Sequence, residues 1–409
     1  MIAFFSNWRR TLLIIFFLAL AVRGAFIFSL QDGYYFPDSI FYSDAAVSLI
    51  NNGQFGEYHR GPVYPAFLAA IYSLFGEKVL YVRIIESLLG ALLAVVVAML
   101  AKRIGDEIVG ALAGILWSVF PIAVFIAGLV YPTSLVTIFL AGGALCVLPY
   151  AYQELSTKRV FFAGFLWGLG SLTVPMVVAT IAVVSGWLIY WGRPQRLALV
   201  SLFLFGSALT IVPWTIRNYL VYDRLVAIEP RALKHLPRLS HSDNTLPDDK
   251  IAAIMKRPDF FAVRFGKEFL HFFQPYPDRI KMSKAGVRDN VHARKPRVVK
   301  NTIFKQGQLI TLVSILSTVP AFVFAIIGSA VMWRRKEQRR ALSMLWAIIL
   351  SFAAGYSVFV SQTRYRIPVE PYIIILSAYG LAQTWQLLRR NIWRELFAAP
   401  KSVGRTNTA

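Results

Sequence analysis

Two aspartates that follow the first apolar run could act as acid–base groups. Asp38 follows a proline and precedes a predicted helix over 39–51, and Asp44 lies six residues further on. A carboxylate at a helix start can cap free backbone N–H groups, or it can accept a proton from an attacking hydroxyl. Two side chains six residues apart on a helix point about a third of a turn away from each other around the helix axis. No glycosidase-type carboxylate pair is therefore expected. Asp38 is the first candidate catalytic residue and Asp44 the second.

Four arginines stand where polar loops meet apolar stretches: Arg60, Arg217, Arg364 and Arg366. The planar guanidinium presents a fork of donors that matches phosphate oxygens. Arginines at such boundaries also anchor chains in the lipid headgroups. We predict that these four residues bind a substrate phosphate, and the anchoring role stays open for Arg60 and Arg217.

Arg83 and Glu86 are spaced i,i+3 in an apolar stretch, which predicts a structural ion pair on one helix face. The histidines show no metal-ligand spacing, and the single cysteine, Cys146, excludes an internal disulfide or a cysteine-based zinc cluster. We therefore predict no metal site and no cofactor, while a requirement for a divalent metal stays open. The histidines are His59, His235, His241, His271 and His292.

The composition excludes a water-soluble protein. Hydrophobic residues make up 57% of the 409 positions and charged residues only 16%, against about 25% charged in soluble domains. The chain is therefore an all-α integral membrane protein. Its net charge of +22 predicts anionic partners such as lipid headgroups or phosphates. Nucleic acid is excluded because the basic residues are divided between the two sides of the membrane.

Charge-free runs define the spans, because an ionised side chain at the bilayer centre costs at least ~2.5–3.5 kcal/mol. The run 108–153 fits two helices of ~20 residues, with a turn near Tyr131-Pro132-Thr133. The run 160–192 has basic flanks on both sides, so the positive-inside rule implies two crossings with a turn near Pro175. About ten spans result, at 11–30, 79–101, two in 108–153, two in 160–192, 197–216, 306–333, 341–363 and 371–388.

The same rule predicts a multi-pass protein of the cytoplasmic membrane with both termini in the cytoplasm. Three segments then face outside, namely 31–78, 217–305 and the short loop 364–370. We divide the chain into an N-terminal membrane module (1–216) that carries the first outside loop, a basic outside loop (217–305), and C-terminal spans with a basic tail (306–409).

Two outside segments are predicted to lie at the membrane surface. The apolar stretch 63–75 is too short to span and is expected to form an interfacial helix. The phenylalanine-rich segment after Arg257 places Phe261, Phe265, Phe269 and Phe272 roughly on one helical face. This pattern favours an amphipathic helix lying on the bilayer.

Six motifs in order along the chain resemble the GT-C glycosyltransferases, in particular the bacterial membrane enzymes of glycosyltransferase family 39 and the lipid A aminoarabinose transferase. No single motif is specific, but the six together cover most of the chain. They read Pro37-Asp-Ser-x-Phe-Tyr, Arg60-Gly-Pro-Val-Tyr-Pro-Ala-Phe-Leu-Ala, Val82-Arg-x-x-x-Ser-Leu-Leu-Gly-Ala-Leu, Pro213-Trp-x-Ile-Arg-Asn-Tyr, Arg257-Pro-x-x-Phe and Arg364-Tyr-Arg-x-Pro-x-x-Pro.

This resemblance implies an inverting hexosyl or pentosyl transferase. Such an enzyme moves a sugar from a polyprenyl-phosphate carrier to an envelope lipid, glycan or protein acceptor at the outer face of the cytoplasmic membrane. The resemblance places the catalytic acidic residue of the family on Asp38, with Asp44 second, and its basic residue for the carrier phosphate on Arg60. The chain departs from the family pattern at Ser39, Val174 and Pro132-Thr133, so the resemblance defines the donor class more closely than the acceptor.

Other membrane functions share some of these features. A transporter or flippase for lipid-linked sugars needs charged or polar groups along a path through the bundle, and spans three to ten are almost devoid of them. A ligase or polymerase that uses diphosphate-linked glycans also needs outside-facing arginines, so this alternative stays open.

Overall fold

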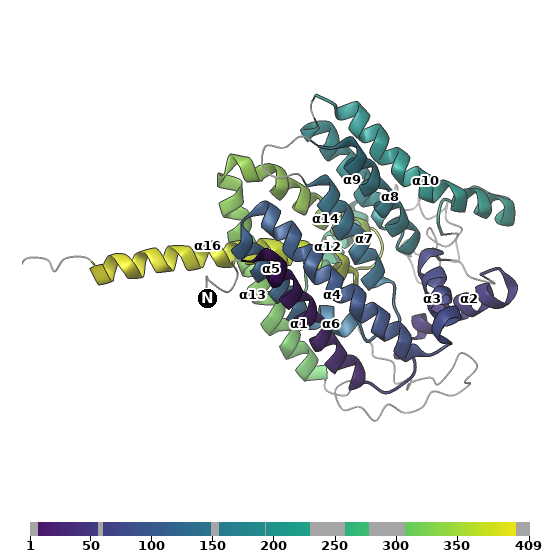
Figure 1. The fold of residues 1–409 in the computed structure, drawn as a ribbon. Coiled ribbons are helices and arrows are strands. Elements are labelled where there is room, and N and C mark those ends of the chain that lie inside the picture. Colours follow the sequence, from purple (N-terminus) through teal and green to yellow (C-terminus); the bar gives the residue numbers. More distant parts are fainter. Residues whose placement is uncertain are drawn as a thin grey trace, which may run out of the picture.

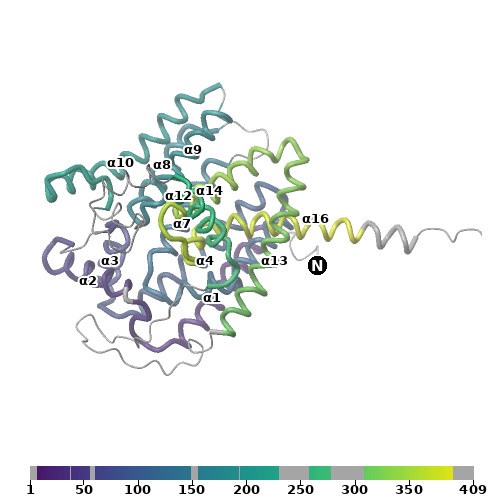
Figure 2. The backbone as a smooth tube through the Cα atoms, turned by 180° about the vertical axis from the view of Figure 1, so that it is seen from behind, coloured from purple at the N-terminus to yellow at the C-terminus, as the bar shows by residue number. Residues whose placement is uncertain are grey.

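A computed structural model describes residues 7–55, 60–148, 155–192, 194–229, 258–277 and 307–397. Every element in these ranges is a helix. The helices form a bundle in which α1 starts and the long α16 leaves on one side, while α2 and α3 lie on the opposite side (Figure 1). The view from behind shows the same separation (Figure 2).

The N-terminal helices follow the predicted ranges closely. The expected interfacial helix 63–75 is confirmed as α3, and α2 extends the predicted 39–51 by two residues at its start and one at its end. Asn7 caps α1 by accepting from the backbone N–H groups of Arg9 and Arg10. The bounds are α1 Trp8–Phe28, α2 Pro37–Asn52, α3 Val63–Phe75 and α4 Val79–Ile104.

Prolines set several of the helix boundaries. A residue before proline is pushed out of the α region, and Phe36, Phe120 and Val174 are all extended there. The run 108–153 is therefore divided twice, at Phe120 and again before Thr133, and 160–192 is divided at Val174. Both predicted turns are confirmed. The bounds are α5 Glu107–Val119, α6 Pro121–Ile126, α7 Thr133–Val147, α8 Thr157–Thr173, α9 Val177–Trp191 and α10 Arg196–Tyr222.

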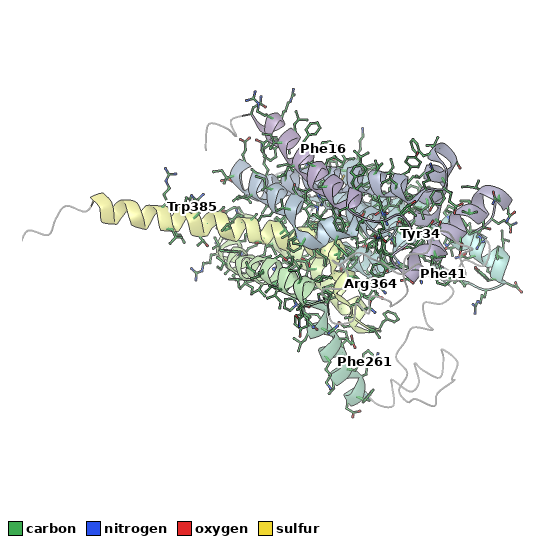
Figure 3. The ribbon with its side chains drawn as sticks, turned by 90° about the horizontal axis from the view of Figure 1, so that it is seen from below. Phe16, Tyr34, Phe41, Phe261, Arg364 and Trp385 are labelled. Atoms are coloured by element: carbon green, nitrogen blue, oxygen red, sulfur yellow. The ribbon has the colours of Figure 1, made fainter. Side chains whose placement is uncertain are left out.

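The C-terminal part adds a helix of 15 residues, three long helices and three short helical elements. A helix in the predicted segment is confirmed as α12, and it projects from the bundle with Phe261 near its free end (Figure 3). Phe272, on the predicted lipid face, is fully buried and stacks on Tyr356, so the position of α12 on the bilayer stays a prediction. The bounds are α12 Pro258–Phe272, α13 Gly307–Arg334, η4 Lys336–Gln338, α14 Arg339–Ser357, α15 Thr363–Arg366, η5 Ile367–Val369 and α16 Glu370–Phe397.

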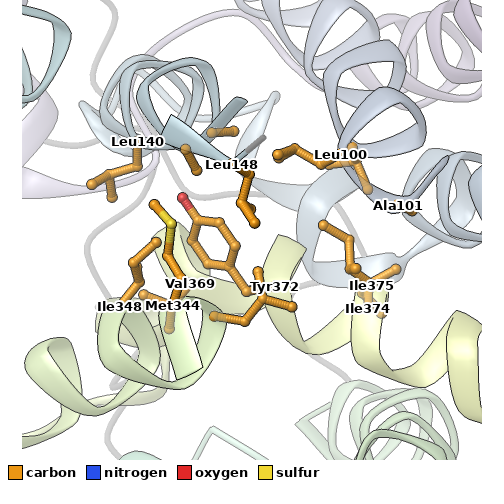
Figure 4. Close-up of a cluster of buried hydrophobic side chains, with 14 of the residues drawn as sticks. Leu100, Ala101, Leu140, Leu148, Met344, Ile348, Val369, Tyr372, Ile374 and Ile375 are labelled. Carbon is orange, nitrogen blue, oxygen red and sulfur yellow. The ribbon is translucent and has the colours of Figure 1, made fainter. Parts of the chain in front are cut away.

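The core lies where α16 enters the bundle. Tyr372 is fully buried there among aliphatic side chains of α4, α7 and α14, with Leu100, Leu140 and Met344 among its neighbours (Figure 4). Burying such side chains stabilises a fold by about 1.5–3 kcal/mol each in water. In lipid, helix association depends instead on close packing. The fit around Tyr372 therefore fixes where α16 begins, and with it the segment just before that helix.

Five helices in the described ranges are long and apolar enough to cross a membrane: α1, α4, α10, α13 and the continuous stretch from η4 through α14. Shorter apolar helices, including α5, α7 and α9, stand between them. The all-α polytopic architecture is confirmed. The count of ten spans and the placement of the termini in the cytoplasm stay predictions, as does the three-part division of the chain.

Candidate active site

Asp38 lies between two arginines from distant parts of the chain. Its Oδ1 is 3.1 Å from Nη2 of Arg60, in the segment before α3, and its Oδ2 is 3.5 Å from Nη1 of Arg364, in α15. All three side chains are partly exposed, at 26% for Asp38, 37% for Arg60 and 25% for Arg364. A charged group from solvent can therefore reach them.

Helix α2 aims Asp38 at these arginines. Pro37 lies in the first turn, and the N-cap residue Phe36 makes no side-chain capping bond. Asp38 is the acidic residue of that first turn, where the helix dipole favours a negative charge. Its two oxygens face Arg60 and Arg364. The capping interpretation of Asp38 is therefore wrong.

Tyrosines surround the charged cluster. Arg60 donates from Nη1 to the Tyr42 hydroxyl at 3.0 Å, one turn of α2 beyond Asp38. Arg364 stacks over the rings of Tyr131 and Tyr365 at 5.5 and 5.3 Å. Stacking of this kind holds a guanidinium without consuming its hydrogen-bond donors.

Burial affects the protonation states of the tyrosine and arginine side chains in this cluster. It raises the pKa of Tyr42 to about 12 and the pKa of Tyr131 well above its usual value. Burial alone would lower the pKa of Arg60, but Tyr42 and Asp38 more than offset this, so its pKa rises. The site at neutral pH therefore contains neutral tyrosines and charged arginines.

Asp44 lies on another side of α2. Burial raises the pKa of Tyr34, and the nearby charges of Glu77 and Asp44 raise it further. The Tyr34 hydroxyl is 2.7 Å from Oγ of Ser43. The catalytic role proposed for Asp44 stays a prediction, and the geometry favours Asp38.

Arg217 packs along its own helix. Its guanidinium stacks on Trp214 and Tyr222 at 4.8 and 5.8 Å and donates to Oδ1 of Asn218 at 3.2 Å. These contacts hold Arg217 near the end of α10, apart from the contacts that Arg60 and Arg364 make with Asp38. A phosphate-binding role for Arg217 stays a prediction.

The contacts of Arg366 are structural, so the geometry does not favour the predicted phosphate-binding role, which stays a prediction. It is 1% exposed and pairs with the fully buried Glu370, Nε to Oε1, at 2.5 Å. Its Nη1 donates to the carbonyls of Phe272 and Gln274 at 3.1 and 2.8 Å. Arg366 thus ties the end of α12 to the start of α16.

Arg83 and Glu86 hydrogen-bond to other partners while each charge still acts on the other, so the predicted ion pair stays a prediction. Arg83 donates to the carbonyl oxygens of Gln31, Gly33 and Gly128 at 2.8–2.9 Å. Glu86 turns to the opposite neighbours: it accepts from the hydroxyls of Tyr64 and Ser134 and from the Tyr131 backbone N–H. Backbone carbonyl groups therefore bind Arg83, and two hydroxyl groups and a backbone N–H bind Glu86.

Sequence reasoning missed Glu229, which the structure places beside Arg60. Burial raises the pKa of this carboxyl group, while the charge of Arg60 and a hydrogen bond from the Gly61 backbone partly offset the rise. Glu229 lies seven residues beyond the end of α10, in a segment without hydropathy pattern. Nothing in the sequence indicated that the chain turns back there.

Metal binding has little support in the described ranges, where no group of three or more His, Cys, Asp or Glu side chains gathers. His271 lies within these ranges. His59, His235, His241 and His292 lie outside them.

The family of dolichyl-phosphate-mannose-protein mannosyltransferases has a sequence model that matches residues 59–216. This stretch begins next to Arg60 and ends in α10. No curated protein sequence matches the chain.

Solved structures match nearly the whole chain. An oligosaccharyltransferase, AglB from Archaeoglobus fulgidus in complex with an inhibitory peptide and a dolichol-phosphate, matches 98% of this chain with a TM-score of 0.58 and 13% identity. ArnT from Cupriavidus metallidurans matches 97% in its apo state, with a TM-score of 0.58 and 15% identity. ArnT bound to undecaprenyl phosphate matches 94%, with a TM-score of 0.56 and 15% identity.

The chain has the fold of the GT-C membrane glycosyltransferases, which confirms the resemblance drawn from its motifs. It is a multi-pass membrane protein of this fold class. The chain spans 53% of the length of AglB, and 64% and 62% of the lengths of the apo and lipid-bound ArnT chains. Its own donor and acceptor are therefore matters for proposal.

Proposed function

We propose that the protein is an inverting glycosyltransferase that moves a sugar from a polyprenyl-phosphate carrier to an envelope lipid, glycan or protein acceptor. One observation carries this proposal: in a GT-C fold, a reachable carboxylate, Asp38, is held by two guanidinium groups at one end of the bundle. The mannosyltransferase family match and the polyprenyl phosphates bound to AglB and ArnT support the donor class.

In the proposed reaction the acceptor hydroxyl attacks the anomeric carbon of the sugar from the face opposite the phosphate. The new bond joins the acceptor oxygen to this carbon, and the bond from the carbon to the phosphate oxygen breaks. The hydroxyl proton passes to Asp38, and the electron pair leaves with the polyprenyl phosphate. A phosphate needs no protonating acid to depart, so a single carboxylate base suffices.

Arg60 and Arg364 are proposed to stabilise the charge that grows on the leaving phosphate. Both already face Asp38, and Arg364 is also held by stacking on Tyr131 and Tyr365 and by a hydrogen bond with Tyr365. Preorganised cations of this kind are most effective where water is excluded. The tyrosine rings around the cluster cover part of it and leave its charged groups only partly exposed. We place the site at the outer face of the cytoplasmic membrane, with the carrier chain between the helices.

The test is turnover with purified protein in detergent, a panel of polyprenyl-phosphate sugars and an envelope extract. Release of polyprenyl phosphate is followed by mass spectrometry. Asp38→Asn should lower turnover by about 10²–10⁴-fold, as expected for loss of a general base. Asp32→Asn is the matched control, because Asp32 is an exposed carboxylate of the same loop and accepts a local hydrogen bond from the Gly33 N–H. Full turnover in folded Asp38→Asn protein would refute the role of Asp38.

A further inference from the structure

The chain beyond α10 folds back along that helix. Asp223 ends α10 in the left-handed conformation, at φ 49°, and so reverses the direction of the chain. Three α10 side chains then hold the returning segment 226–228 by its carbonyl groups. They are Trp214, Thr215 and Asn218.

These contacts are close, and those of Asn218 are buried, whereas that of Trp214 is partly buried and that of Thr215 is exposed. Nε1 of Trp214 donates to the Ile228 carbonyl at 3.1 Å, and Oγ1 of Thr215 donates to the Ala227 carbonyl at 2.9 Å. Nδ2 of the fully buried Asn218 donates to the carbonyls of Val226 and Ile228 at 3.1 and 3.2 Å. The motif Pro213-Trp-x-Ile-Arg-Asn-Tyr thus has a structural use: it fixes the backbone on which Glu229 stands.

Glu229 is the next residue after this fixed segment. Its carboxylate accepts a hydrogen bond from the Gly61 backbone N–H and lies within the field of the Arg60 guanidinium. Its negative charge also reaches Tyr42, where it acts on the pKa together with Arg60 and Asp38. Glu229 therefore belongs to the same cluster as Asp38 and approaches it from the α10 side.

The partner of Glu229 cannot move away easily. Helix α8 packs directly against Gly61, where an added Cβ would lie 2.8 Å from the Leu172 carbonyl carbon and closer still to its oxygen. The turn that carries Arg60 thus packs against α8 and is hydrogen-bonded to Glu229 through the Gly61 N–H. Arg60 contacts Asp38 directly and lies within electrostatic reach of Glu229.

We propose that Glu229 is the second carboxylate of the active site and the positioning residue for Arg60. It holds the Arg60–Gly61 turn so that the guanidinium presents one edge to Asp38 and the remaining donors to a phosphate. The part of this inference that concerns phosphate rests on the proposed function. The part that concerns Arg60 does not.

Two readouts test the inference separately. The first is labelling of Arg60 by phenylglyoxal, quantified by peptide mass spectrometry, which needs no knowledge of the substrate. Glu229→Ala should speed labelling of Arg60 roughly two- to tenfold, the change expected for loss of one hydrogen-bonding partner. Glu229→Gln keeps an acceptor for the Gly61 N–H and should give a smaller increase. Trp214→Phe keeps an aromatic ring but removes the N–H donor to the Ile228 carbonyl, and it should also speed labelling of Arg60.

The second readout is the split between KM and kcat for the polyprenyl-phosphate sugar. Glu229→Ala should raise the donor KM about tenfold, which corresponds to about 1.4 kcal/mol, with a smaller change in kcat. A residue that only supported the fold would lower the amount of active protein and leave KM unchanged. Glu77→Gln is the matched control, because Glu77 is exposed between α3 and α4.

The outcomes separate the two proposals. Faster labelling of Arg60 in Glu229→Ala, together with wild-type protein that turns over no donor, would support the positioning role and refute the proposed function. Unchanged labelling and unchanged donor KM in folded Glu229→Ala, with turnover intact, would overturn the positioning role and leave the proposed function standing.

Discussion

Gly61→Ala is the most direct perturbation of the site, because it adds one carbon and no charge. The new Cβ would lie 2.8 Å from the carbonyl carbon of Leu172. Carbon atoms in favourable contact stand ~3.5–4.0 Å apart, so the turn or α8 must move by roughly 0.7–1.2 Å. Both contacting groups are backbone, so no side-chain rotation relieves the clash. Overpacking of this kind costs typically ~1–3 kcal/mol.

This movement would displace the two groups on which the proposed chemistry depends, the Arg60 guanidinium and the Gly61 N–H. Arg60 is adjacent to Gly61, and its 3.1 Å contact with Asp38 would lengthen toward 4 Å or more after a shift of about 1 Å. The Gly61 N–H would move away from Glu229 at the same time. A misplacement of 1 Å in a catalytic site costs about 10²-fold in rate.

The assay measures polyprenyl-phosphate release, Arg60 labelling and thermal stability in one preparation. We expect turnover to fall about 10²-fold while a folded, modestly less stable protein remains. Gly24→Ala serves as the control, because a Cβ at Gly24 meets nothing within 4 Å. Gly61→Ala protein with the turnover and labelling of wild type would refute the reasoning that α8 fixes the Arg60 turn.

Three further predictions concern the surroundings of the site. Burial raises the pKa of Tyr42 from 10.0 to about 12. The neutral Tyr42 should therefore add ~1–3 kcal/mol to the free energy of unfolding below pH ~10, and this stabilisation should be lost as the pH rises toward 12. The difference in melting temperature between wild type and Tyr42→Phe, measured from pH 8 to 11.5, should shrink accordingly. Glu86→Leu should destabilise the protein by ~1–3 kcal/mol for each orphaned hydroxyl, Tyr64 included, whereas Glu86→Gln should melt near wild type. Arg366→Met should cost ~3–5 kcal/mol by leaving Glu370 buried without its cation, and the double variant with Glu370→Leu should recover stability in size-exclusion and melting assays.

The sequence was sufficient for most of the helices and for two of their breaks, but not for the break at Phe120. Prolines push the preceding residue out of the helix, so the breaks near Pro132 and Pro175 could be located in advance. The apolar run 63–75 is too short to span a bilayer, so it could be identified in advance as a helix that does not cross the membrane. Asp38, Arg60 and Arg364 were also identified as candidates before the fold brought them together.

Side-chain partners were harder to predict, because they depend on segments far away in the chain. Arg366 and Glu370 are one helical turn apart and fully buried, and only the packing of α12 over them reveals this. Glu229 required knowledge of a chain reversal after α10 that rests on the left-handed Asp223 and three polar side chains. Local periodicity contains no information about such contacts.

The ion pair between Asp38 and Arg364 joins residues 326 positions apart. Contacts of such high sequence separation form late, because the loop between them must first be ordered. During synthesis at the membrane, the first helices are inserted long before α15 leaves the ribosome. A partly made chain therefore has Asp38 without Arg364, and the full charge arrangement arises only when the last helices have joined the bundle. Any fragment that ends before α15 should fold in part and lack the assembled site.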